Sequence, residues 1–253
     1  SSSSAASDVY KRQVLMPTLK IIYDRDKEIA DFKVTKYYKL KGIFQTEDKK
    51  KFDSIYYIKA GEKFDNPEEL KEIQEKIKDK NGEVVSKKIT NKKEYPPYLF
   101  NLSGLQGYIT SKYKGWTSDR VLKTAQQLYE KKFITYPRTA SVVLDESLKE
   151  KTAKVLNIHK KSCPYEEMIQ FKSTKRIFDS KKVESHSAII PTYMQPGSLN
   201  ESERIVYEAV KNRFLAQFMP IAVAEDTVLH IKMQNTDIPV SYTHLRAHET
   251  RSN

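Results

Sequence analysis

The sequence predicts an α+β fold in which a β-rich region is interrupted by a helical insert. Residues 34–60 alternate tyrosines with polar residues, as paired strands do. After Pro97 the apolar residues recur at helical spacing instead. A helix predicted at 201–218 is then followed by strand-like alternation at 223–233. The order of strands, helices and strand is typical of an insertion.

Composition and charge exclude several classes of protein and indicate the kind of partner. The 253 residues carry a net charge of +12, and 38% of them are hydrophobic, enough for a sizeable core in one large domain or two small ones. No apolar run could span a bilayer and no signal peptide is recognisable, which excludes membrane and secreted classes. The lone Cys163 excludes an intrachain disulfide and a cysteine-only metal cage. The basic excess indicates a polyanionic partner, with nucleic acid first.

The two ends differ from the rest. Residues 1–13 have no periodicity, and residues 240–253 depart abruptly from the strand pattern before them. Both resemble translated sequencing-adapter read-through, so we expect neither to be native; a linker or tag is the alternative. Because each end carries +1, residues 14–239 keep 12 − 1 − 1 = +10. We expect the native protein to continue in both directions.

Residues 14–30 precede the β-rich region, and a helix opened by Pro17 is predicted within them. Asp24, Asp26 and Glu28 mimic a D-x-D-x-E metal site. Since residues two apart on a helix do not face each other, we interpret them as a solvent-exposed face.

Two strands are predicted around the turn QTEDKKK, followed by a helix at 67–80 and a strand at 83–90. The helix has Asn66 as N-cap, Pro67 at its first position and a stop at Asn81.

The helical insert is predicted to contain helices at 102–113, 118–132 and 144–157. Thr117 or Ser118 can cap the middle one. Its buried stripe is expected to comprise Val121, Leu122, Ala125, Leu128 and Tyr129. Gln126 and Glu130, four residues apart, should project together at the edge of that stripe. Asn200 and Glu203 predict a capping box for the helix at 201–218.

Few residues suggest chemistry on their own. No glycine-rich phosphate loop and no zinc-ligand spacing occurs, which removes support for nucleotide hydrolysis and zinc binding. In Ile134–Thr139, Tyr136 could act as a nucleophile if positive charge favours its phenolate, and Arg138 lies on the same side of an extended segment. In a chain with 16 tyrosines, a packed or stacking tyrosine is the favoured reading of that residue alone. His186 alone is better read as a structural, hydrogen-bonded histidine.

Two segments, considered together, favour a functional role for Tyr136 and His186 over a structural one. QLYEKKFITYPRT at 127–139 and ESHSAIIPT at 184–192 resemble, in order and separation, the two signature stretches of bacterial type IA DNA topoisomerases. Pro137 and the AIIPT ending are closer to the topoisomerase III group. Residues 14–30 are similar to the family segment before its β-rich domain. The resemblance covers residues 14–239.

The resemblance implies a chemistry and a site. Tyr136 would attack a phosphodiester of single-stranded DNA, leaving a 5′-phosphotyrosine and a free 3′-hydroxyl; a second strand would pass, and the break would reseal without ATP. Arg138 would stabilise the phosphate and His186 would contact DNA near the break. The cleft residues would be Gln126 and Glu130, with Thr135 and Thr139 as backbone or phosphate contacts.

The resemblance also implies parts that this sequence lacks. The family's N-terminal Toprim domain, whose acidic cluster binds Mg²⁺, does not occur in it, and Asp24, Asp26 and Glu28 do not replace it. Ala140 follows the R-T pair where an Asp is common, and Gln13 occupies a functional Arg position. We therefore expect the fragment alone to be inactive, with Mg²⁺ as cofactor of the full-length enzyme only.

The implied architecture is a β-rich arch domain at 31–97, a helical catalytic-tyrosine domain at 98–195 and a second part of the arch at 196–239. The expected partner is single-stranded DNA, without membrane association, in the cytoplasm at the nucleoid. A non-enzymatic single-stranded nucleic-acid-binding module is the alternative, since basic grooves and tyrosines also stack bases. A partner-binding scaffold has only the charged helix at 67–80 in its favour.

Overall fold

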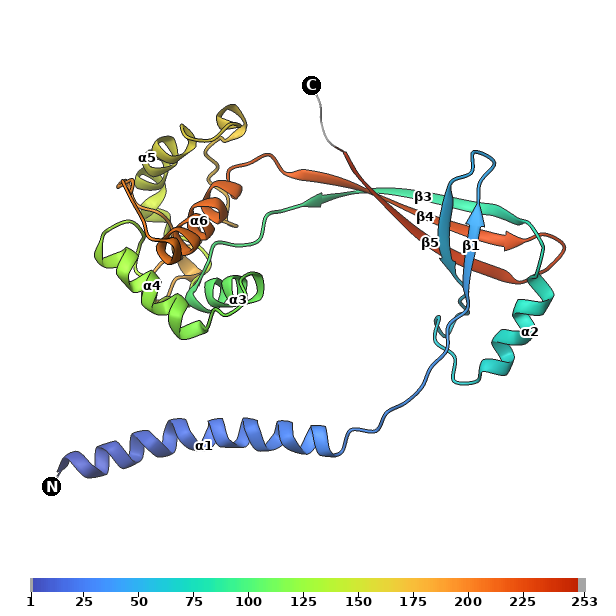
Figure 1. The fold of residues 1–253 in the computed structure, drawn as a ribbon, viewed down its shortest axis with the longest axis horizontal. Helices are drawn as coiled ribbons and strands as arrows, with labels where there is room; N and C mark the ends of the chain where they lie inside the picture. The colour runs from blue at the N-terminus through green and yellow to red at the C-terminus, as the bar shows by residue number, and fades with distance from the viewer. Residues whose placement is uncertain (1, 250–253) are drawn as a thin grey trace. The chain divides into compact units, whose positions relative to one another are not determined.

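The computed structural model describes the backbone of residues 2–249 and the side chains of residue 13 and residues 15–238. It contains helices and antiparallel strands, which confirms a mixed α and β composition (Figure 1). The chain forms two compact units. The first comprises the chain up to Ile89 together with Thr227–Leu245, and the second contains Thr90–Asp226.

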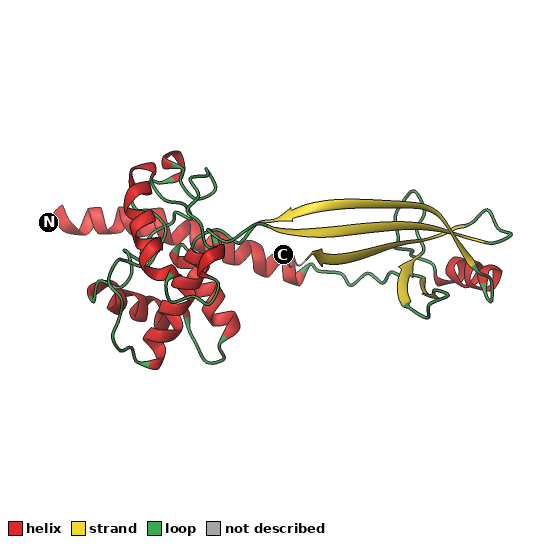
Figure 2. Cartoon of the chain, turned by 90° about the horizontal axis from the view of Figure 1, so that it is seen from above, coloured by secondary structure: helices red, strands yellow, loops and turns green. Residues whose placement is uncertain are grey.

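The first unit is built on a five-stranded sheet of order β1-β2-β5-β4-β3. β1 (Lys41–Gln45) and β2 (Lys51–Ile55) pair antiparallel, which confirms the two strands predicted around QTEDKKK. The long strands are β3 (Gly82–Glu94), β4 (Ala222–Met233) and β5 (Pro239–Glu249), drawn in yellow in Figure 2. Residues 34–40 are irregular apart from a bridge between Tyr38 and Phe64, so the predicted strand region is shorter than expected.

Helix α2 (Pro67–Ile77) follows its sequence signals closely. The Asn66 side chain accepts a hydrogen bond from the backbone N–H of Glu68 at 3.0 Å, which satisfies one of the open donors of the first turn. Leu70 is buried in a small cluster with Tyr56 and Phe64, and this cluster fixes the helix to the hairpin. The helix ends three residues before the predicted limit of 80.

Helix α1 (Ser2–Ala30) begins well before Pro17, where the sequence predicted its start. Pro17 removes one hydrogen-bond donor but does not end the helix. Asp24 pairs with Lys20 at 2.6 Å and Glu28 with Arg25 at 2.9 Å, all of them exposed, as expected of a solvent-facing surface. That residues 1–13 and 240–253 are not native stays a prediction. Most of their side chains lie outside those that the structure describes, and residues 1 and 250–253 lie outside the described residues altogether.

The second unit packs four helices: α3 (Leu102–Lys112), α4 (Ser118–Glu130), α5 (Lys149–Lys160) and α6 (Glu201–Ala216). Thr117 caps α4 through its side chain, which decides between the two predicted caps. The capping box of Asn200 and Glu203 is present at the start of α6. α5 begins at Lys149 because a short 3₁₀ turn, capped by Asp145, precedes it.

Helix α6 joins this helical unit, whereas the predicted limits at 195 and 196 assigned it to the β-rich part. Its Val206 and Val210 are fully buried in one core with Ala125 and Leu128 of α4. Phe214 and Phe218 continue into a second core of the same unit. The apolar pattern of α6 predicts which of its faces is buried, but it does not predict which element covers that face.

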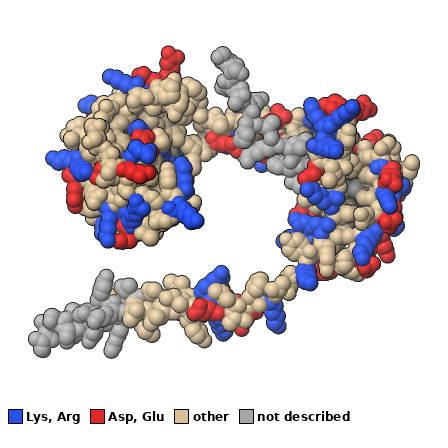
Figure 3. Space-filling model, in the orientation of Figure 1, with Lys and Arg blue, Asp and Glu red and all other residues tan. Residues whose placement is uncertain are grey.

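Lys and Arg side chains are interspersed with Asp and Glu on the visible face of the helical unit (Figure 3). No described helix is long and apolar enough to cross a membrane. Cys163 is a half-buried free thiol.

Candidate active site

The Tyr136 segment is an extended run that follows α4. Lys132, with φ of 66°, turns the chain out of the helix. Ile134, buried to 1% exposure, then forms a bridge with Pro191, and the Thr135 N–H donates to the Ile190 carbonyl at 2.9 Å. The two segments singled out in the sequence therefore lie side by side.

Two threonine hydroxyls bind these segments together. Thr139 Oγ1 donates to the His186 carbonyl at 2.8 Å and accepts from the Ser141 N–H at 3.1 Å. Thr135 Oγ1 accepts from the Ile190 N–H at 3.0 Å. Both hydroxyls are thus engaged by protein backbone, and the role at the DNA cleft expected for these threonines stays a prediction.

Tyr136 and His186 meet at a small pocket. Their ring centroids lie 4.6 Å apart, with the planes tilted by 51°. Both side chains line a pocket of about 230 Å³, with Leu144 and Leu148 on its apolar side. Tyr136 is half-buried and His186 is exposed, so the phenol is supported by packing yet remains reachable.

Arg138 points its charge into solvent. Its side chain is exposed and forms no hydrogen bond or ion pair with any other described residue. The sequence predicts that Arg138 and Tyr136 lie on the same side of the extended segment, but the structure shows no contact between their side chains. An unpaired guanidinium two residues from the phenol is nevertheless free to hold an anion.

The last turns of α4 approach the same tyrosine. The Tyr129 ring lies 5.2 Å from that of Tyr136, nearly edge-on at 69°. Tyr129 is 39% exposed, so the prediction that it belongs to the buried stripe of α4 is wrong. Gln126 Nε2 donates to Glu130 Oε1 at 3.3 Å, which confirms that these two project together. Neither is among the described residues that line the Tyr136 pocket.

Comparison with known proteins decides the family. A family model described as DNA topoisomerase matches residues 13–248. The chain belongs to the type IA DNA topoisomerase family.

Its relatives agree with the topoisomerase III resemblance. The topoisomerase chain is 32% identical over 231 residues to DNA topoisomerase 3 of Staphylococcus epidermidis, covering 88% of this chain and 31% of that protein. It is 33% identical over 215 residues to DNA topoisomerase 3 of Staphylococcus aureus, covering 82% and 29%. Full-length topoisomerase I from Thermotoga maritima matches in structure with a TM-score of 0.62 and 29% identity, over 91% of this chain and 36% of that one. The chain therefore spans only about a third of the length of the relatives it matches.

The residues of this topoisomerase chain do not by themselves fit a magnesium ion. No group of three His, Cys, Asp or Glu side chains within the described part of the chain could hold a metal. None of the described residues that line the Tyr136 pocket carries a carboxylate. Mg²⁺ prefers several oxygen ligands in octahedral geometry, and carboxylates are its usual protein ligands.

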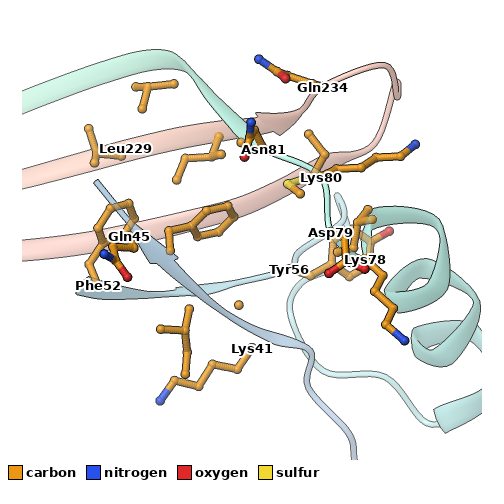
Figure 4. Close-up of a pocket in the computed structure, with 18 of the residues that line it drawn as sticks. Lys41, Gln45, Phe52, Tyr56, Lys78, Asp79, Lys80, Asn81, Leu229 and Gln234 are labelled. Atoms are coloured by element: carbon orange, nitrogen blue, oxygen red, sulfur yellow. The ribbon is translucent and has the colours of Figure 1, made fainter. Parts of the chain in front are cut away.

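A larger pocket, of about 960 Å³, lies in the first unit of the topoisomerase chain (Figure 4). Lys41 and Gln45 of β1, Phe52 of β2 and Leu229 of β4 lie around it. It contains none of the predicted site residues. Sequence reasoning missed the contact of Tyr129 with Tyr136, and helical spacing carries no signal for it, because α4 ends at Glu130 and Tyr136 lies on the extended run that follows.

Proposed function

We propose that this chain is part of a topoisomerase III-like enzyme that cleaves and reseals single-stranded DNA without ATP. In the forward step the Tyr136 phenol gives up its proton as a bond forms between Oη and phosphorus, the bond from phosphorus to the 3′-oxygen breaks, and that oxygen takes up one proton and leaves as a 3′-hydroxyl, so that no net proton is gained or lost. The tyrosine keeps the 5′-phosphate. After another strand has passed, the 3′-hydroxyl attacks the phosphotyrosine and restores both groups.

The observation that carries this proposal is the meeting of Tyr136 and His186. They come from two separate signature segments, their rings lie 4.6 Å apart, and they line one pocket. A nucleophile needs room for the reacting group, and the pocket beside the Tyr136 ring supports the proposal in this respect. His186 is proposed to contact DNA beside the attacked phosphate.

Arg138 is the proposed electrostatic group. Negative charge grows on the phosphoryl oxygens as the phenol attacks, and a planar guanidinium can hold two of them. Because no described acidic side chain pairs with Arg138, its charge is available to the substrate. Gln126 and Glu130 are proposed to contact DNA at the edge of the same cleft.

We further propose that the full-length enzyme takes its Mg²⁺ ligands from a Toprim domain outside residues 1–253, and that it works in the cytoplasm at the nucleoid. When bound, the ion would supply positive charge beside the phosphate. On this proposal the fragment alone neither relaxes supercoiled plasmid nor forms an appreciable covalent adduct, with or without Mg²⁺. Clear Mg²⁺-dependent relaxation by the purified fragment would contradict it.

The test of the nucleophile uses the full-length protein, reconstructed from its reading frame, and 3′-labelled single-stranded DNA on a denaturing gel, because the fragment that stays on the tyrosine keeps its 3′ end. Tyr136→Phe should abolish the covalent adduct while leaving DNA affinity nearly unchanged. Tyr129→Phe is the matched control, since it alters a neighbouring phenol and keeps the ring contact. An adduct that persists in Tyr136→Phe would place the nucleophile elsewhere.

A second variant separates binding from chemistry. Arg138→Ala should slow cleavage far more than it weakens binding, because the charge acts mainly in the transition state. The alternative function, a non-enzymatic binder of single strands, predicts DNA binding without any adduct in the wild-type enzyme. Either function implies that the affinity for DNA depends strongly on salt. Each neutralised phosphate contributes about −0.7 to the slope of the logarithm of the binding constant against the logarithm of the salt concentration.

A further inference from the structure

A second pocket of the helical unit contains no residue of the Tyr136 pocket. It has a volume of about 500 Å³. Its walls come from the segment 95–98 that leads into α3, the loop at 172–177 and the segment 217–221 that follows α6, with Lys182 beside them. Three distant parts of the sequence thus form one cavity that the proposed chemistry does not use.

Arg176 lines this pocket and contacts two of its tyrosines. Its guanidinium carbon lies 4.0 Å from the ring centroid of Tyr98 and 5.2 Å from that of Tyr95. Nη2 donates to the Pro96 carbonyl at 2.6 Å, which fixes the plane of the group. Nε is buried without a partner, and Nη1 forms no hydrogen bond with any described residue. Arg176 therefore keeps Nη1 as a donor that an anion can satisfy, whereas the buried Nε is out of an anion's reach.

The pocket is strongly basic. Lys172, Lys175 and Lys182 line it together with Arg176, and no acidic residue is among the described residues of its wall. Lys172 is held by the Met219 carbonyl, and Lys182 lies 3.8 Å from Asp179 outside the lining. Lys175 is exposed and has no partner in the described part of the chain. A phosphate would thus meet several donors and little opposing charge.

Aromatic surface lies directly beside these cations. Tyr95 is 51% exposed and Tyr98 is 39% exposed, although each contacts Arg176. Sites that bind single strands combine exposed aromatic rings, on which bases stack, with cations that follow the phosphates. We propose that this pocket binds a nucleotide of single-stranded DNA, with its base on Tyr95 and its phosphate at Lys175 and Arg176. The choice of DNA as ligand rests on the proposed function.

The new site is one layer of backbone away from the Tyr136 pocket. The Leu144 N–H donates to the Ile177 carbonyl at 2.7 Å; Leu144 lines the Tyr136 pocket, and Ile177 lines the basic one. The two pockets therefore share a wall of the helical unit. The role proposed for the new site is to retain the strand on the unit that carries Tyr136.

The test measures fluorescence anisotropy of a labelled oligothymidylate with the purified chain of residues 1–253, over a range of salt. The oligonucleotide has roughly 12 nucleotides, within the usual span of small single-strand sites. An abasic strand of the same length and inorganic phosphate serve as further probes. Tyr95→Ala and Lys175→Ala are the test variants. Their controls are Tyr165→Ala, which removes a tyrosine of similar exposure (48%), and Lys114→Ala, which removes an exposed lysine outside the pocket.

We expect Tyr95→Ala to weaken binding of oligothymidylate by at least about fivefold and to leave the abasic strand unaffected, because one stacked base is lost. Lys175→Ala should make the salt slope less steep by about 0.7, since one phosphate contact is lost. The two controls should bind as the wild type does.

Three results would overturn the inference: both test variants binding like the wild type, controls losing as much affinity as test variants, or inorganic phosphate competing as well as the oligonucleotide. The Tyr136→Phe adduct assay fails or succeeds independently. If Tyr95→Ala binds like the wild type while Tyr136→Phe abolishes the adduct that the wild type forms, only this site is refuted. If Tyr95→Ala has the expected effect while the adduct persists in Tyr136→Phe, only the proposed nucleophile is refuted.

Discussion

The hydroxyl of Thr139 connects the two halves of the candidate active site, so its removal is a direct test of how the site is held. Thr139→Val keeps the shape of the side chain and removes the bond to the His186 carbonyl at 2.8 Å. The same change removes the acceptor for the Ser141 N–H at 3.1 Å. Thr139 and Ser141 are 8% and 7% exposed, so water replaces these partners poorly.

The expected cost follows from these two bonds. A buried polar group left without its partner costs about 1–3 kcal/mol, and the exposed His186 can recover part of its loss from water. We therefore expect Thr139→Val to lower the free energy of unfolding by about 2 kcal/mol. For a chain of this size that corresponds to a fall in melting temperature of about 4–8 °C.

Thermal melting followed by circular dichroism measures the change, with Thr139→Ser as the matched control because it keeps the oxygen. In the full-length enzyme, Thr139→Val should also reduce adduct formation, since His186 is no longer fixed beside Tyr136. Thr139→Ser should restore most of both properties. If the valine and serine variants melt together at the wild-type temperature, the hydroxyl does not hold the site and the reasoning fails.

Three further changes have defined outcomes. Burial, aided by the nearby Lys211, lowers the pKa of His159 below its ordinary value of about 6.5. Between the lowered pKa of the folded state and the ordinary pKa of the unfolded state, the unfolded chain binds a proton that the folded chain does not. The free energy of unfolding should therefore fall as the pH drops below about 6.5, and His159→Gln should make the accompanying fall in melting temperature less steep. Asn200→Ala removes the capping box of α6 and should cost about 1 kcal/mol in urea unfolding, with Asn200→Ser close to wild type. Gly82→Ala places a Cβ 2.7 Å from the Phe44 ring and should destabilise the first unit by about 1–3 kcal/mol, whereas Gly107→Ala meets no atom within 4 Å; equal unfolding curves for the two would contradict this.

Elements with local signals were predictable from the sequence. α2 and α6 carry their cap residues, first-turn acids and apolar stripe within one short stretch, and both form where expected. The start of α1 was not predictable, since its first half has no such pattern and Pro17 pointed to a later beginning. Local rules locate a helix well only when its ends are marked.

Tertiary partners explain the remaining differences. Nothing in the α6 stripe says that α4 rather than the sheet covers it. Tyr129 looks like a core residue on the helical wheel but packs edge-on against Tyr136 at the surface. The pairing of Tyr136 with His186 was predictable only through the family resemblance, because neither residue stands out alone. The pocket around Arg176 was not predictable, since its walls come from three separated segments.

The discontinuity of the first unit has a consequence for the order of folding. Gly82 packs closely against Ile231, yet the whole helical unit, Thr90–Asp226, lies between them in the chain. During synthesis from the N-terminus, β1 and β2 can pair early, but β4 and β5 emerge only after the helical unit is complete. The helical unit is complete before β4 and β5 emerge and can fold first, while β3 waits with an open edge for its partner. Exposed strands in this interval make the sheet, rather than the helical unit, the part of the nascent chain most prone to aggregation.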